Sequence, residues 1–172
     1  MPEQVIHTHQ LPNGLTVVVE PMADVQSASF AFLVPGGSAF DPVGQNGTAA
    51  ILTDWITRGA GELDSRELSN ALDNLGVQHS ESTGINHLAF SAASLGSNLA
   101  AALRLCGEIL QRPQFPDDEF EGAMAGVEQS LRAMEDEPQR KVIIELRRRC
   151  YDAPWGLPTE GRLEDLEHIT PE

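Results

Sequence analysis

Histidine is the side chain in this sequence best suited to bind a metal ion or to move a proton near neutral pH. The chain has five histidines, and no two of them lie four residues apart in a predicted helix: His7, His9, His79, His87 and His168. His7 and His9 are expected on one side of a strand, and His79 and His87 are candidates to face each other across a strand pair. Two such residues alone more often mark exposed polar positions than a metal site.

Serine and cysteine act as nucleophiles only beside a suitable base, as in a serine–histidine–acid triad. Ser65 and Ser130 have no histidine and acid partners that the sequence places beside them. Cys106 and Cys150 lie far apart on helical patterns and match neither a CxxC metal site nor the disulfide framework of a secreted protein. We expect both cysteines to be buried thiols.

The charge balance excludes polyanions as natural partners. The 172 residues include 26 acidic and 11 basic side chains, which gives a formal net charge of −15. This charge repels nucleic acid and anionic membranes, and no stretch reaches the roughly 20 apolar residues that span a bilayer. Because the sequence begins without a basic and apolar leader, it predicts a cytoplasmic chain, or a periplasmic one if a leader was removed.

The first part of the chain reads as strands. Residues 7–10 and 15–20 flank an Asn-Gly pair, which favours a hairpin turn. A third strand over residues 27–34 alternates apolar and small side chains and stops at Pro35-Gly36-Gly37-Ser38. These glycines indicate backbone turns, because they lack the spacing and the lysine of a phosphate-binding loop.

Helices and a second strand pair follow. A short helix between Gly47 and Gly59 directs three apolar side chains toward a core: Leu52, Trp55 and Ile56. Asp64 and Glu67 have the spacing of a capping box at the start of the next helix. Strands are predicted over residues 77–83 and 87–95.

The last third is predicted to be mainly helical. One helix covers residues 98–111, and another begins at Asp117 and is broken by Pro138. The pattern resumes with Val142 and Leu146 on its apolar face, and the chain becomes irregular from residue 152. This order of elements predicts an α+β fold, in which a mixed or antiparallel sheet has helices packed on one face. One domain over residues 1–172 is expected.

Short motifs spread over nearly the whole chain resemble the N-terminal domain of the M16 metallopeptidases, the family of pitrilysin, insulin-degrading enzyme and the mitochondrial processing peptidases. These motifs are Leu11-Pro-Asn-Gly-Leu-Thr-Val-Val-Val19, Gly37-Ser38, Gly47-Thr-Ala-Ala50, Leu75-Gly76, Glu81-Ser-Thr83, Phe115-Pro116, Glu135-Asp-Glu-Pro138 and Gly161. Their order and spacing carry the resemblance. It implies the half-shell domain of that family and a fragment of a longer, two-domain chain.

The resemblance also implies that the family's zinc site has been lost. Active members carry an H-x-x-E-H motif, in which two histidines on one helix face bind zinc and the glutamate activates the bound water. The corresponding residues here are Ala50, Thr53 and Asp54, and the third ligand, a glutamate on a later helix, corresponds to Ser130. Because no histidine lies between His9 and His79, no shift of register restores the motif. We therefore expect no catalytic residue, no metal and no cofactor.

The expected function follows from this loss. The resemblance implies a non-catalytic domain or subunit that pairs with an active M16 subunit, or with a second M16 domain, and helps bind or enclose peptide substrates. Family substrates add a strand to a sheet edge, and the residues of that edge here are Ser80, Glu81, Ser82 and Thr83. Two alternatives stay open: an active metallopeptidase with a non-standard metal site, and a structural subunit like the core subunits of the respiratory bc1 complex.

Overall fold

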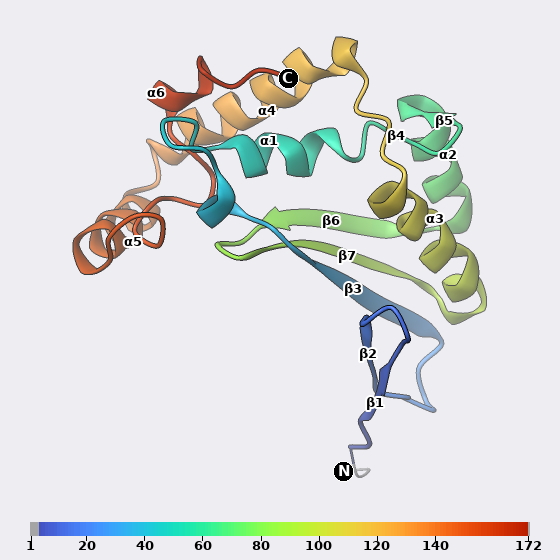
Figure 1. The fold of residues 1–172 in the computed structure, drawn as a ribbon. Helices are drawn as coiled ribbons and strands as arrows, with labels where there is room; N and C mark the ends of the chain where they lie inside the picture. Colours follow the sequence, from blue (N-terminus) through green and yellow to red (C-terminus); the bar gives the residue numbers. More distant parts are fainter. Residues whose placement is uncertain (1–3, 172) are drawn as a thin grey trace.

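A computed structural model describes residues 4–171 of the chain. The first element is a hairpin of β1 (His7–Gln10) and β2 (Thr16–Val19), in which His7 lies opposite Val19. Gly14 supplies the positive φ of 89° that the turn requires, which confirms the predicted hairpin. Every residue of both strands is exposed, and the hairpin lies apart from the main sheet in Figure 1.

The main sheet of the described chain is antiparallel. Its strands are β3 (Ser27–Pro35), β6 (Gln78–Thr83) and β7 (His87–Leu95), in the order β3-β7-β6. The helices lie on one face of this sheet in Figure 1, so the predicted α+β architecture is confirmed. In this arrangement β6 is an edge strand whose only strand partner within residues 4–171 is β7.

Helix α1 (Thr48–Trp55) lies over β6 and is shorter than the sequence predicted. After Trp55 the backbone forms turns and then the short strand β4 (Gly59–Ala60), which pairs with β5 (Leu63–Asp64). The predicted apolar face is wrong in part, because Ile51, only 1% exposed, is buried more deeply than Leu52. Ile51 and Trp55 pack in one apolar cluster and Ile56 in a second, so α1 lies between two cores.

Two helices enclose the second core. Helix α2 (Ser65–Leu75) begins with the predicted capping box, in which Asp64 and Glu67 each accept a hydrogen bond from the other's backbone N–H. Helix α3 (Leu99–Gln111) buries Cys106 and Ile109 completely. Burial raises the pKa of the Cys106 thiol to about 11.

The C-terminal part differs most from the prediction. Helix α4 (Asp117–Met134) ends before Pro138, which starts helix α5 (Pro138–Cys150). No residue of α5 is buried, so the expectations that Val142 and Leu146 face a core and that Cys150 is a buried thiol are wrong. Within residues 4–171, no helix is long and apolar enough to cross a membrane.

The segment after residue 152 is also more ordered than predicted. It contains helix α6 (Leu163–Leu166), and both Leu166 and Ile169 are buried in the cluster that holds Ile51 and α4. Such a short helix gives too few residues for a periodic pattern. The burial of α6 depends on contacts with α1 and α4, which lie far from it in the sequence.

Candidate functional site

A cleft of about 620 Å³ lies where α1, β6 and α4 meet. It brings together the four positions that the family resemblance assigns to the zinc ligands and the base of active relatives. Its lining includes Ala50, Thr53 and Asp54 from α1, Glu81, Ser82 and Thr83 from β6, Ser130 from α4, Arg140 from α5, and Glu160. Ser80, the remaining predicted peptide-binding residue, is exposed on β6 outside this lining.

The hydroxyl groups at two of these positions are used inside the fold. Thr53 Oγ1 donates a hydrogen bond of 2.6 Å to the Ala49 carbonyl and shares a bond of 2.9 Å with Thr83 Oγ1. This pair ties α1 to β6. Ser130 Oγ donates to the carbonyl of Gly126, one turn earlier in α4, at 3.0 Å. Within residues 4–171, both hydroxyls bond to backbone carbonyls or to another hydroxyl, and not to a base that would make either a nucleophile.

The Asp54 carboxylate is held by a cation. Arg58, one helical turn further along, contacts Asp54 Oδ1 at 2.6 Å and Glu119 Oε2 on α4 at 2.7 Å. Burial by itself lowers the pKa of Arg58, but its hydrogen bonds to these two carboxylates raise the pKa overall. Arg58 therefore links the Asp54 carboxylate of α1 to Glu119 of α4 through two ion pairs.

The zinc ion of active relatives does not fit this set of side chains. The four corresponding positions offer one carboxylate, which Arg58 already engages, two hydroxyl groups bonded to backbone carbonyls, and a methyl group. Zinc needs about four nitrogen, sulfur or oxygen ligands in a tetrahedral arrangement. Within residues 4–171, no three histidine, cysteine, aspartate or glutamate side chains gather closely enough to hold a metal ion.

A second polar pair lies along β6. His79 Nδ1 contacts Glu81 Oε1 at 2.7 Å, and the imidazole ring stacks on Phe90 with ring centroids 5.9 Å apart. The hydrogen bond to Glu81 is the largest influence on His79 and raises its pKa. His79 lies opposite Ala92 and His87 opposite Pro35, so the expectation that these two histidines face each other is wrong.

Arg140 and Glu160 form a third ion pair in the cleft lining, with an N–O distance of 2.7 Å. Burial by itself raises the pKa of Glu160, but hydrogen bonds from Arg140 and Thr159 lower it overall. Sequence reasoning missed this pair, because no local pattern connects residues 20 positions apart.

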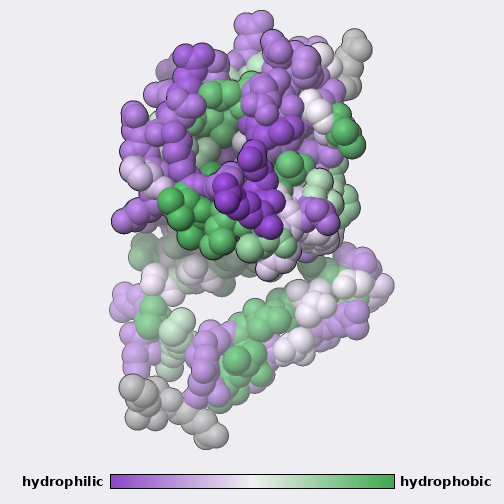
Figure 2. All heavy atoms as spheres, turned by 90° about the vertical axis from the view of Figure 1, so that its left-hand side faces the viewer, coloured by the Kyte–Doolittle hydropathy of each residue, from purple (hydrophilic) through white to green (hydrophobic). Residues whose placement is uncertain are grey.

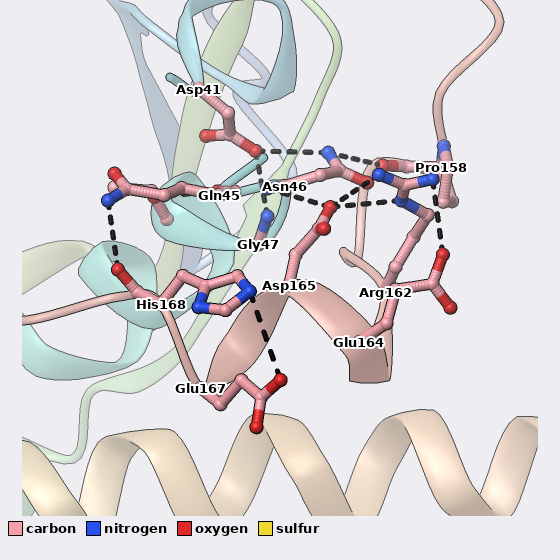
Figure 3. A network of polar contacts seen from close by, with 11 residues as sticks. Asp41, Gln45, Asn46, Gly47, Pro158, Arg162, Glu164, Asp165, Glu167 and His168 are labelled. Carbon is pink, nitrogen blue, oxygen red and sulfur yellow. Dashed lines mark hydrogen bonds and ion pairs between the residues drawn. The ribbon is translucent and has the colours of Figure 1, made fainter. Parts of the chain in front are cut away.

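The N-terminal end of α1 rests on a separate, buried polar network, shown in Figure 3. Asp41 accepts hydrogen bonds from the backbone N–H groups of Gly47 at 2.9 Å and Ala49 at 2.8 Å, so it caps the helix from the preceding loop. Asp165 accepts from the backbone N–H of Asn46 at 3.2 Å and from Arg162 at 2.7 Å. Burial raises the pKa of Asp41 in spite of these bonds.

Two glycines let this loop and the C-terminal segment touch through their backbones. Gly161 has a φ of 103°, and a Cβ atom placed there would lie 2.6 Å from the Cα atom of Gly47. Gly47 itself has a φ of 125°, a region that other residues rarely adopt. Both glycines are therefore required by the contact that positions the start of α1.

Sequence and structure comparisons agree on the family. The profile of the insulinase family, peptidase family M16, matches residues 16–161. The chain is 26% identical over 163 residues to a probable mitochondrial-processing peptidase subunit beta of Arabidopsis thaliana, covering 94% of this chain and 31% of that protein. It is 23% identical to an uncharacterized zinc protease of Rickettsia bellii, covering 92% of this chain and 39% of that protein. The chain thus spans about a third of the length of these relatives.

Solved structures share the fold. A peptidase M16 inactive domain from Pseudomonas fluorescens superposes with a TM-score of 0.84 at 19% identity, covering 96% of this chain and 41% of that one. Pitrilysin superposes with a TM-score of 0.80 at 20% identity, covering 95% of this chain and 18% of that one. With a family profile that matches most of its length, the chain belongs to the insulinase family of peptidases, family M16.

Proposed function

We propose that this M16 domain is non-catalytic, binds extended peptides along β6, and pairs with an M16 subunit that carries the zinc motif. One observation supports this proposal above the others. The cleft and the edge strand lie side by side, whereas the side chains at the four former zinc-site positions supply neither a set of metal ligands nor an activated nucleophile. Peptide binding by strand addition uses backbone groups and needs no metal.

The hydrogen-bond pattern of β6 identifies the backbone groups that a peptide would use. The N–H of Gly84 donates to the carbonyl of His87 at 2.8 Å, which fixes the alternation along the β6–β7 ladder. Residues 80 and 82 therefore bond to β7, and the N–H and C=O groups of His79, Glu81 and Thr83 point to the open edge. A strand added there would pair with those three residues.

The charges of the cleft favour no strongly charged peptide. Three carboxylates lie in its lining, and each contacts a basic side chain: Asp54 contacts Arg58, Glu81 contacts His79, and Glu160 contacts Arg140. Affinity would then come mainly from backbone hydrogen bonds and from apolar contacts.

The strand-addition step is tested by Glu81→Pro, with Glu81→Ala as its matched control. Both variants lose the carboxylate, but only proline removes the outward N–H, and proline is tolerated on an edge strand. We expect Glu81→Pro to weaken binding of a fluorescent apolar peptide about tenfold relative to Glu81→Ala, measured by anisotropy. Circular dichroism checks that both variants are folded. Equal binding by the two variants would rule out this edge as the binding site.

The pairing step is tested by mixing the chain with a zinc-motif M16 subunit of the same organism. We expect a stable complex on gel filtration and faster cleavage of a fluorogenic peptide than by either protein alone. A second mixture contains the partner with its motif glutamate changed to glutamine and should be inactive, which assigns all chemistry to the partner. Zinc at one ion per chain together with chelator-sensitive cleavage by this chain alone would overturn the non-catalytic assignment. A complex without faster cleavage or peptide binding would instead indicate a structural subunit.

A further inference from the structure

Helix α5 differs from helices α1 to α4 because its apolar side faces solvent. Val142, Ile143 and Leu146 are 64%, 57% and 56% exposed, and Cys150 is exposed on the same side. Their spacing of three, four and seven residues places them in one stripe along the helix. Only Ile144, on the opposite side, packs against the apolar cluster of α1 and α4.

The turn that follows the helix adds exposed aromatic side chains. Tyr151 and Trp155 are both exposed, and a hydrogen bond of 2.9 Å from the Gly156 N–H to the Asp152 carbonyl closes this turn. Figure 2, which views the side of the molecule where α5 lies, shows apolar surface directly beside strongly hydrophilic surface. An exposed apolar area with a charged border is typical of a protein contact surface.

The charge of α5 is opposite to that of the chain. The helix carries five of the chain's eleven basic residues and one carboxylate: Arg140, Lys141, Arg147, Arg148, Arg149 and Glu145. By helical spacing, Arg149 borders the stripe on one side and Arg147 on the other. Arg148 and Arg149 share Glu145, whereas no carboxylate within residues 4–171 forms an ion pair with Arg147 or Lys141. The uncompensated cations would therefore attract an acidic partner.

We infer that α5 with its following turn, residues 138–155, is the surface through which this domain docks an apolar, carboxylate-rimmed surface of the zinc-motif M16 subunit. This inference rests on the proposed function. A protein partner fits better than a membrane or a nucleic acid. The net charge of −15 repels polyanions, and few of the α5 cations are free of internal partners. A protein surface needs only a few charges around an apolar centre.

The test uses Leu146→Glu and Arg147→Glu in the complete chain, with Leu103→Glu as a matched control on the partly exposed face of α3. Binding to the zinc-motif subunit is measured by isothermal titration calorimetry. We expect each α5 variant to bind at least about tenfold more weakly than the wild type, and the α3 variant to bind like the wild type. Circular dichroism melting shows whether each variant is folded. If Leu146→Glu does not fold, Arg147→Glu, which changes a half-exposed cation, still decides the question.

The outcomes separate this inference from the proposed function. If the wild type binds the subunit and the α5 variants bind equally well, the docking surface is wrong and the pairing stands. If the wild type does not bind, the pairing and its surface are both wrong. A third measurement is sedimentation with phosphatidylserine vesicles. Co-sedimentation of the wild type that Leu146→Glu abolishes would overturn the inference in favour of a membrane surface.

Discussion

Helices α1 and α5 both contribute to the cleft lining, yet they are buried to opposite extents. Helix α1 lies between two apolar clusters and has a capped N-terminus, whereas α5 contributes only Ile144 to an apolar cluster of the described residues. A helix packed on both sides keeps its position through its core contacts, whatever polar residues its remaining face carries. A helix that exposes its apolar side adds little to its own domain, so its sequence must be explained by another contact.

The largest expected difference is between removing an apolar side chain from α1 and removing one from α5. Ile51→Ala empties part of a core and should lower the free energy of unfolding by about 3 kcal/mol. Leu146→Ala removes an exposed side chain and should change it by less than about 0.5 kcal/mol. Urea unfolding followed by circular dichroism measures both values. Similar losses would show that α5 packs as tightly as α1.

The capped end of α1 gives the next effect. Asp41→Ala leaves the N–H groups of Gly47 and Ala49 without an acceptor and should cost about 2 kcal/mol of unfolding free energy. Asp24→Ala, at an exposed position, serves as the control and should cost nothing measurable. An Asp41 variant as stable as the control would mean that the network in Figure 3 does not hold the helix.

A smaller effect is expected from the ion pair on β6. Because Glu81 raises the pKa of His79 in the folded protein, the folded state binds this proton more tightly than the unfolded state. The resulting stability is complete below the pKa of an unfolded histidine and is lost as the pH rises through the folded value. Between about pH 6 and about pH 8, the wild type should therefore lose more stability than Glu81→Gln. NMR titration of the His79 ring measures the pKa directly, and an unchanged value in Glu81→Gln would refute the assignment.

The two thiols should differ in reactivity without affecting stability. Cys106 is buried on α3 with a pKa raised to about 11, and Cys150 is exposed on α5. Iodoacetamide at about pH 8 should label one thiol in the native protein and two after denaturation. Peptide mass spectrometry identifies the labelled residue, and Cys150→Ser should abolish native labelling. Native labelling of Cys106 would show that the core around α3 opens readily.

Local signals made part of the fold predictable. The capping box at Asp64 and the Asn-Gly turn act within a few residues, so the sequence alone predicts them. The burial of Leu166 and the exposure of Leu146 depend on which elements meet in three dimensions. Helical periodicity alone therefore predicts neither the burial of Leu166 nor the exposure of Leu146.

The positions that line the candidate site could be predicted from the sequence, but the ion pairs around them could not. The family resemblance implied that Ala50, Thr53, Asp54 and Ser130 share one place, and these residues do line a single cleft. It gave no sign of the Arg140–Glu160 pair or of the Arg58 bridge, because side chains of other elements supply these contacts. Their recognition required the packing of α1 against α4 and the return of the chain after α5.

The hydrogen bond between Asn46 and Asp165 has a consequence for the order in which the chain folds. It joins residues 119 positions apart, and the approach of Gly47 to Gly161 is nearly as distant in sequence. During synthesis α1 leaves the ribosome long before Asp165, so the loop at the start of α1 can form these contacts only after residues 158–165 have been made. A nascent chain stalled before residue 158 would hold the helix without this anchor, and closing that long loop would be among the last steps of folding.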